Sequence, residues 1–156
     1  MSESHRPGQG RPEPSPNWFQ RMRAGLEPPP PVATLLGAVI RSVDIDDGHL
    51  RVDYLAQPSF ANPAGSVQGG MLCAMLDDLC ASLVDATLAP GQFVATLTLN
   101  TSYLRSAGIG PLQGHARLKR RGRQICVVEA DLLQNGETVA SAVATCMIAA
   151  AAPTKG

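Results

Sequence analysis

The sequence predicts an α+β fold in which one long helix packs against a mostly antiparallel β-sheet. Two strand-like segments precede an apolar helical stretch over residues 69–88, and four more strand-like segments follow it with tight returns. The strand–helix alternation that builds parallel sheets does not occur. Of the 156 residues, 44% are apolar and 17% charged, enough apolar material for one domain with a sizeable core.

The chain divides into a Pro-rich tail, one domain and a short C-terminal tail, over residues 1–31, 32–150 and 151–156. Little in residues 1–16 can be buried. Asn17 is a candidate N-cap for a short helix over residues 17–26, and a mobile tail is the alternative. The apolar side chains of that helix share one side: Trp18, Phe19 and Met22. Four prolines at 28–31 predict an extended connector into the domain.

Strand signals lie on both sides of the long helix. Residues 34–43 are apolar and β-branched, and Asp47-Gly48 is a strong hairpin signal before the next strand-like segment. Pro90-Gly91 ends the helix. The four later segments are residues 93–105, 112–119, 124–133 and 138–149, the last two joined by Asn135-Gly136. One helix covers one face of a sheet, so the other face, apolar in VASAVATCMIAA, is expected to need a second subunit.

Composition excludes several classes of function. Thirteen basic and thirteen acidic residues give a formal net charge of zero, which offers no broad attraction to nucleic acid or to an anionic membrane. The N-terminus lacks the apolar core of a secretory signal, and no apolar run reaches the roughly 18 residues of a membrane span. The widely spaced cysteines favour reduced core thiols over disulfides or zinc ligands. A cytoplasmic location is expected.

Two adjacent aspartates lie on the most apolar helix, in GGMLCAMLDD. On an ideal helix, five apolar residues lie on one face and form the expected core stripe: Leu72, Met75, Leu76, Leu79 and Leu83. Asp77 borders this apolar arc, where an unpaired carboxylate is costly to bury. Asp78 points about 100° further round, near Asp85, and is expected to be a solvated surface charge. Asp77 is therefore the candidate for chemistry.

Gly69 and Gly70 begin this helix. Without Cβ atoms they let a ligand approach backbone N–H groups that, at a helix N-terminus, stabilise an oxyanion; ordinary loop punctuation is the alternative. Asp77 lies about 10 to 12 Å further along the axis, too far for both to contact one atom within one chain. We therefore expect a partner subunit to bring the carboxylate to the glycines.

Residues 60–78 resemble the motif of the hotdog-fold acyl-CoA thioesterases, in their phenylacetate-degradation (PaaI-type) branch. That motif has an asparagine, a run of small residues, His-Gly-Gly and, after six more residues, an aspartate. In this chain these positions are Asn62, Gln68-Gly69-Gly70 and Asp77. The likeness extends over residues 30–149 and includes PPPVATLLGAVI and TLTLNTSYLRSA.

The resemblance implies a hotdog fold, homo-oligomeric assembly and hydrolysis of acyl-CoA thioesters without a metal or redox cofactor, coenzyme A being part of the substrate. It makes Asp77 the catalytic nucleophile or general base, and the N–H of Gly69 the group that polarises the thioester carbonyl. Asn62 would position the attacking water or the carbonyl, and the hydroxyl of Thr96 would assist the water. The aspartate of one subunit would face the glycine turn of its partner. Dimer and tetramer remain alternatives.

Gln68 departs from the motif, because glutamine exchanges hydrogen bonds but cannot become a cation as histidine does. Function is preserved if that side chain mainly fixes the loop, and is reduced or altered if its charge matters. Gln68 and Gly70 are counted with the candidate substrate-binding residues. A non-catalytic acyl-CoA-binding or regulatory module on the same fold is the main alternative. A hydratase is disfavoured because no histidine lies in this loop or helix.

Two further features bear on the substrate. In VATLTLNTSYL, Thr96, Thr98 and Asn100 alternate with leucines, which predicts one polar strand face; a solvated edge is the alternative. The cluster RLKRRGR is a candidate for binding the phosphates of coenzyme A, or simply a solvated hairpin tip. The candidate phosphate ligands are Arg105, Arg120, Arg121 and Arg123.

Overall fold

The computed structural model describes residues 15–150, so residues 1–14 of the predicted N-terminal tail and all of the C-terminal tail lie outside the described residues. The helices are α1 (Trp18–Arg23), α2 (Pro31–Leu35), the 3-10 turn Pro58–Phe60 and α3 (Gly69–Ala86). The strands are β1 (Val39–Asp44), β2 (His49–Ala56), β3 (Gln92–Tyr103), β4 (Gly110–Arg121), β5 (Ile125–Gln134) and β6 (Glu137–Ala150). The predicted hairpins at Asp47-Gly48 and Asn135-Gly136 are confirmed.

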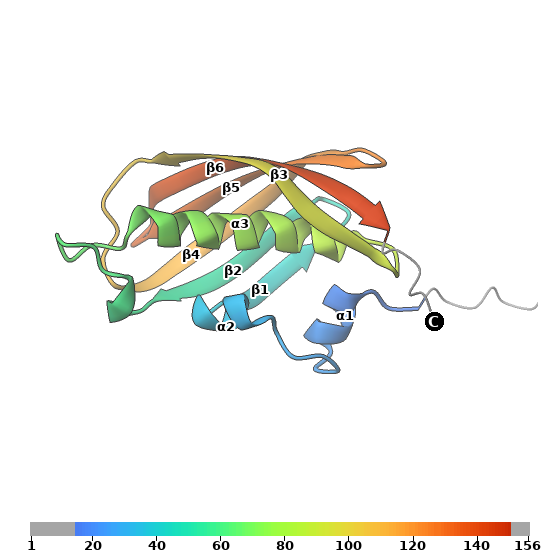
Figure 1. Cartoon of the computed structure of the whole chain (residues 1–156), viewed down its shortest axis with the longest axis horizontal. Helices are drawn as coiled ribbons and strands as arrows, with labels where there is room; N and C mark the ends of the chain where they lie inside the picture. The colour runs from blue at the N-terminus through green and yellow to red at the C-terminus, as the bar shows by residue number, and fades with distance from the viewer. Residues whose placement is uncertain (1–14, 151–156) are drawn as a thin grey trace, which may run out of the picture.

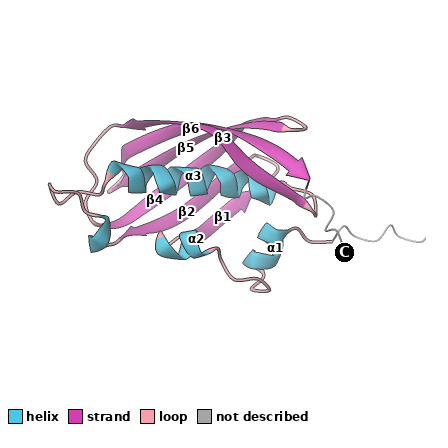
Figure 2. Cartoon of the chain, in the orientation of Figure 1, coloured by secondary structure: helices cyan, strands magenta, loops and turns pink. Residues whose placement is uncertain are grey.

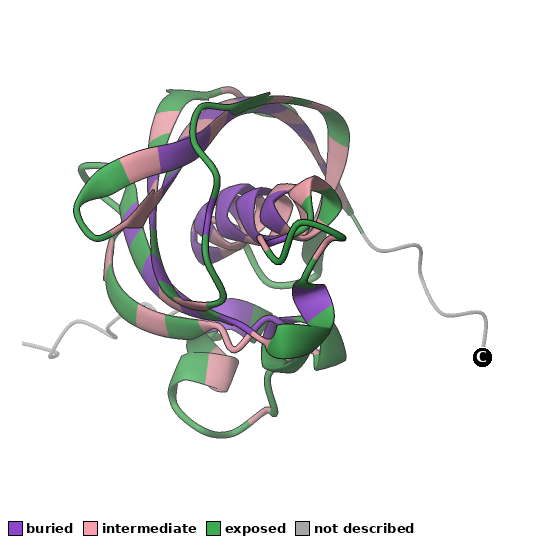
Figure 3. Cartoon of the chain, turned by 90° about the vertical axis from the view of Figure 1, so that its left-hand side faces the viewer, coloured by how far each residue is buried: buried purple, intermediate pink, exposed green. Residues whose placement is uncertain are grey.

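All six strands form one antiparallel sheet in the order β1-β2-β4-β5-β6-β3, with α3 lying along its concave side (Figures 1 and 2). Seen down the helix, the sheet curves around α3 (Figure 3). The predicted core stripe is confirmed, since each of its five side chains is at most 3% exposed. Among the described residues, no helix is long and apolar enough to cross a membrane.

The helix packs closely against the sheet at Gly114 of β4. A Cβ atom added to Gly114 would lie 2.8 Å from the Leu79 side chain on α3 and 2.9 Å from the Tyr54 ring on β2. Both side chains are buried. Because contacts this short are not tolerated, only glycine fits at this point of the sheet.

The segment before β1 packs onto the domain. Asn17 caps α1 with its Oδ1 atom and donates from Nδ2 to the carbonyl of Leu88, just beyond α3, at 2.8 Å. Phe19 is buried in the main core, so the apolar side predicted for this helix faces the domain. The strand expected from residue 34 is wrong in its start, because Pro31 begins α2 and β1 starts only at Val39. Proline is favoured at the first position of a helix.

Strand β3 contains an irregularity that sequence alternation alone does not predict. Its pairing with β6 shifts between Thr96 and Thr98, so Leu97 is an extra residue. Thr96 contacts α3 before the bulge, and Thr101 and Tyr103 contact it afterwards. The single polar face expected for Thr96, Thr98 and Asn100 is therefore wrong: a one-residue bulge moves every later side chain to the opposite face.

Replacing Gly114 tests the close approach of helix and sheet. Gly114→Ala is expected to lower the free energy of unfolding by about 1–3 kcal/mol, because overpacking forces Leu79 or Tyr54 out of place. Urea denaturation measures the change. Gln113→Ala, on the exposed face of the same strand, is the matched control. Equal stability of Gly114→Ala and wild type would show that the sheet can relax here.

Asp85, half-buried near the end of α3, is expected to make stability depend on pH. Burial, with the neighbouring Asp78 carboxylate, raises its pKa to about 7. Because the folded protein then binds the extra proton, stability is fully present below about pH 4 and falls by up to about 4 kcal/mol as pH rises to about 7. Asp85→Asn should remove this loss.

Unfolding free energies at pH 5 and pH 8 measure the effect. The advantage of Asp85→Asn over wild type should be larger at pH 8. Asp46→Asn, which changes an exposed loop aspartate, should give no such gain. A constant difference between Asp85→Asn and wild type at both pH values would contradict the prediction.

Candidate active site

Asp77 and Thr96 lie together between α3 and β3. The hydroxyl of Thr96 donates a hydrogen bond of 2.8 Å to Oδ1 of Asp77, and both side chains are half-buried. No other hydrogen bond within residues 15–150 reaches the Asp77 carboxylate. The donated bond fixes one oxygen and leaves Oδ2 for a substrate, a water molecule or a proton. Thr96 stands immediately before the β3 bulge, which thus turns the strand next to this carboxylate.

The glycine turn forms a second part of the candidate site. Gly69 is the first residue of α3 and lines a pocket of about 360 Å³. Within residues 15–150 the amides of Gly69 and Gly70 donate to no other group, as expected for the first turn of a helix. The space around Gly70 is open, whereas a Cβ on Gly69 would lie 3.3 Å from the Tyr103 ring.

Asn62 lines the same pocket from the loop before α3. Its Oδ1 atom accepts from the amides of Ala64 and Ser66, at 3.0 and 3.1 Å. The side-chain oxygen is therefore used to shape the loop. Its Nδ2 group is the part of Asn62 that can donate to a ligand.

The carboxylate and the glycine turn do not meet within one protomer. Asp77 does not line the glycine pocket, and it lies eight positions after Gly69 on the helix, about 12 Å along the axis. The single chain thus presents an acid and a set of unpaired amides as two halves of a site.

Gln68 immediately precedes α3, is exposed and makes no side-chain cap. Its backbone holds the turn instead, through an N–H bond to Phe60 and a carbonyl that accepts from Met71. The loop geometry therefore does not depend on the Gln68 side chain.

The candidate phosphate ligands lie at opposite ends of α3. Arg105 lines the glycine pocket, donates to the carbonyl of Thr138 and pairs with Glu137 at 3.6 Å. Arg121 donates a hydrogen bond of 2.9 Å to the hydroxyl of Thr87. Thr87 caps the C-terminal end of α3, about 27 Å along the helix axis from Gly69. Arg120 lines the same hollow as Arg121, and Arg123 is exposed in the adjoining turn. One protomer does not bring Arg105 and the basic hairpin together.

The expectation that Asp78 is a solvated surface charge is wrong. Its Oδ2 atom accepts a hydrogen bond of 2.8 Å from the hydroxyl of Tyr54, a buried residue of β2. Burial, followed by repulsion from Asp77, raises the pKa of Asp78, although the Tyr54 bond opposes the rise. A flat sheet would have left this helix face in water, but the sheet curves around α3 (Figure 3), and Tyr54 brings β2 into contact with Asp78.

Sequence reasoning also missed both tyrosines. Tyr54 follows Leu50 and Val52 on the buried face of β2, and a buried tyrosine hydroxyl needs a partner. That pattern could have indicated a polar acceptor on the helix opposite. Tyr103 donates a hydrogen bond of 3.0 Å to the carbonyl of Gly69. Its orientation cannot be predicted from strand alternation, because the β3 bulge changes the face on which later side chains lie.

Comparison with known proteins agrees with this architecture. The sequence profile of the acyl-CoA thioesterase N-terminal domain matches residues 56–147. Among curated protein sequences no significant match was found. Among solved structures, a phenylacetic acid degradation-related protein of Ralstonia eutropha JMP134 is 56% identical. The match covers 84% of this chain and 99% of that one, with a TM-score of 0.83.

More distant structures share the fold. The PaaI protein of the E. coli phenylacetic acid degradation operon is 24% identical, with a TM-score of 0.66 and coverage of 74% of this chain and 86% of that one. A thioesterase of Haemophilus influenzae is 19% identical, with a TM-score of 0.71 and coverage of 80% and 86%. Because the profile match spans most of the sheet and all of α3, the chain belongs to the hotdog-fold acyl-CoA thioesterases of the PaaI-like group, which hydrolyse acyl-CoA thioesters.

Proposed function

We propose that Asp77 performs carboxylate-assisted hydrolysis of an acyl-CoA, with the thioester carbonyl held on the amide of Gly69 from a second copy of the chain. The observation that carries the proposal is the Asp77–Thr96 hydrogen bond, which fixes one carboxylate oxygen and leaves the other unengaged. A carboxylate held in one orientation beside an apolar helix face is well placed to act on a bound thioester.

The reaction needs few groups. A water molecule loses its proton to Asp77 as its oxygen bonds to the carbonyl carbon, and the resulting oxyanion accepts from the Gly69 amide. Asn62 Nδ2 donates to the same oxygen or to the water. The C–S bond then breaks, and the thiolate leaves and takes up the proton as free coenzyme A. In this proposal no metal or redox cofactor takes part.

Direct attack by Asp77 is the other form of the same chemistry, through a mixed anhydride between the aspartate and the acyl group. Hydrolysis of that anhydride at its aspartyl carbon places a solvent oxygen in the enzyme. After a single turnover in ¹⁸O-water, label in the peptide that contains Asp77 would identify Asp77 as the nucleophile. Label confined to the product acid is expected both of a general base and of water attack on the acyl carbon of the anhydride, and trapping of the anhydride with hydroxylamine separates these two cases.

A second copy is expected to dock at the β3 edge. β3 pairs with β6 on one side only, and its 12 residues end the sheet. Phe93, Leu97 and Tyr103 are each about half exposed along it. A long apolar edge strand favours pairing with a strand of another chain, because its outer N–H and C=O groups have no partner strand. Two-fold pairing here would run the two α3 helices antiparallel and bring Asp77 toward the glycine turn of the partner.

The phosphates of coenzyme A are proposed to bind the basic hairpin. Arg120 and Arg123 enter no ion pair within residues 15–150 and are exposed. Arg105 is already paired with Glu137, so in the proposed complex it contributes mainly at the glycine pocket.

Removing the proposed catalytic charge is expected to abolish most activity. Asp77→Asn should lower kcat about 10²–10⁴-fold, the contribution of a positioned general base. Thr96→Val should have a smaller effect, because it removes the orienting bond and leaves the carboxylate. Thiol release from an acyl-CoA panel measures both. Asp85→Asn, a substitution on the same helix outside the site, is the control; equal turnover by Asp77→Asn and wild type would remove Asp77 from the mechanism.

The amide of Gly69 can be deleted without disturbing the helix. Proline is tolerated at the first helical position, and Gln68 already has the ψ of 133° that a residue before proline requires. Gly69→Pro is expected to lower kcat about 10²–10³-fold through the lost oxyanion donor. Gly69→Ala adds the same Cβ near Tyr103 but keeps the N–H, so most activity should remain. Similar losses in both variants would assign the effect to crowding.

Mixing variants tests which subunit supplies the amide. Asp77→Asn and Gly69→Pro dimers are co-denatured, refolded together and assayed. Random pairing should restore about a quarter of wild-type activity, because half of the dimers are mixed and each has one intact site of two. No recovery in verified mixed dimers would place both groups in one chain.

A further inference from the structure

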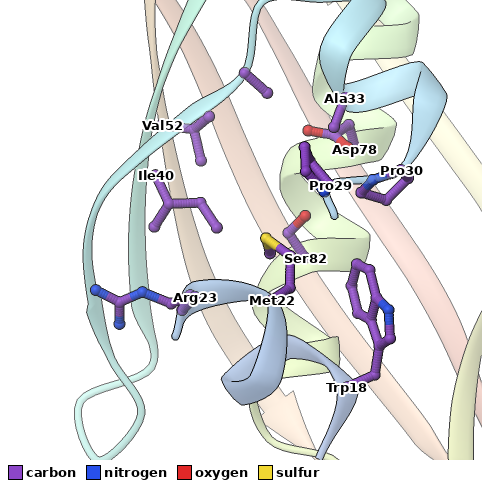
Figure 4. Close-up of a pocket in the computed structure, with 11 residues that line it drawn as sticks. Trp18, Met22, Arg23, Pro29, Pro30, Ala33, Ile40, Val52, Asp78 and Ser82 are labelled. Atoms are coloured by element: carbon purple, nitrogen blue, oxygen red, sulfur yellow. The ribbon is translucent and has the colours of Figure 1, made fainter. Parts of the chain in front are cut away.

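A separate pocket lies on the side of α3 that faces away from β3. It is enclosed by α1, the segment leading into α2, the strands β1 and β2, and the helix itself, with a volume of about 250 Å³ (Figure 4). Met22, Ile40 and Val52 supply apolar walls, and the indole of Trp18 stands at one end. Asp77 and Thr96 do not line it, so the pocket is a different cavity from the proposed hydrolytic site.

The polar groups of the pocket come from one face of α3. Asp78 and Ser82 are one helical turn apart and both line the cavity, opposite Ile40 and Val52 in Figure 4. Tyr54 binds one oxygen of Asp78 at 2.8 Å. No other hydrogen bond within residues 15–150 reaches this carboxylate. One carboxylate oxygen and one hydroxyl thus remain for a ligand.

The charge of Asp78 lacks a counter-ion in the described part of the chain. None of the ion pairs within residues 15–150 includes it. The carboxylates that influence it add negative charge, since Asp77 raises its pKa and Asp78 in turn raises that of Asp85. Arg23 lines the pocket, but its exposed guanidinium points away from Asp78, toward the Ile40 side (Figure 4).

We propose that this pocket binds a small organic ammonium ion, whose N–H groups donate to Asp78 and Ser82 while its apolar body lies between Met22, Ile40 and Val52. A half-buried carboxylate without a counter-ion favours a cation, and a charge-assisted hydrogen bond gives it a direction. The Trp18 ring offers a further favourable surface for a cation. An anionic ligand would meet like charge. The volume exceeds the roughly 150 Å³ of an apolar cavity that binds benzene, so an aryl or branched alkyl amine fits.

Benzylamine, protonated at neutral pH, is a suitable probe, with benzyl alcohol as its neutral counterpart. Trp18 is the one tryptophan of the chain, so its fluorescence reports on the pocket directly. Calorimetry of the full-length protein gives stoichiometry. We expect saturable binding of one benzylammonium per chain, and affinity for benzyl alcohol at least about tenfold weaker, because the alcohol forms no ionic bond. Absence of saturable binding, or equal affinity for both probes, would overturn the proposal.

Variants locate the binding. Asp78→Asn should weaken benzylammonium binding by about tenfold or more, whereas Asp85→Asn, on the same helix outside the pocket, should not. Asp77→Asn should bind the probe normally, which separates this site from hydrolysis. Ser82→Leu keeps Asp78 but fills the cavity, so it should prevent binding of both probes. This variant replaces Asp78→Asn in the test if Asp78→Asn does not fold. Unchanged affinity in folded Asp78→Asn, or in Ser82→Leu, would place the probe elsewhere.

Discussion

The structure depends on how closely one apolar helix is enclosed by a curved sheet. Gly114 lets the side chains of Leu79 and Tyr54 approach the β4 backbone, and the rest of the sheet bends around that contact. Since strand twist and curvature surround α3, two adjacent residues of the helix meet different strands. Asp77 meets β3 and Asp78 meets β2. The same enclosure therefore separates the proposed hydrolytic centre from the second pocket.

Most of the fold was accessible from the sequence. The apolar stripe of α3 repeats with helical period, and turn residues mark the hairpins, so local patterns specify these elements. The resemblance, however, gave Thr96 only as a hydroxyl that assists the attacking water, and its hydrogen bond to Asp77 was not predicted. No local pattern shows that these two residues, 19 positions apart, come into contact.

The errors have a common physical origin in tertiary context. The exposure predicted for Asp78 assumed that one helix face meets water, and a helical projection does not contain the curvature of a sheet. The alternation predicted for β3 assumed regular pairing, but a bulge at Leu97 depends on the partner strand. The predicted start of β1 was wrong because the apolar and β-branched residues from position 34 favour a strand, whereas Pro31 begins the helix α2. In each case a long-range contact or a backbone signal overrode local preference.

Asn17 gives the N-terminal segment a role that its composition conceals. One side-chain amide caps the start of α1 with its oxygen and, through its nitrogen, satisfies a carbonyl just past the end of α3. Phe19, on the same short helix, is buried in the main core, so α1 covers part of that core. A shortened chain that begins at the apparent domain boundary would thus uncover apolar surface and orphan a helix-end acceptor. Proteolytic removal of α1 is therefore expected to lower the solubility of the protein, because it exposes the apolar surface that α1 covers.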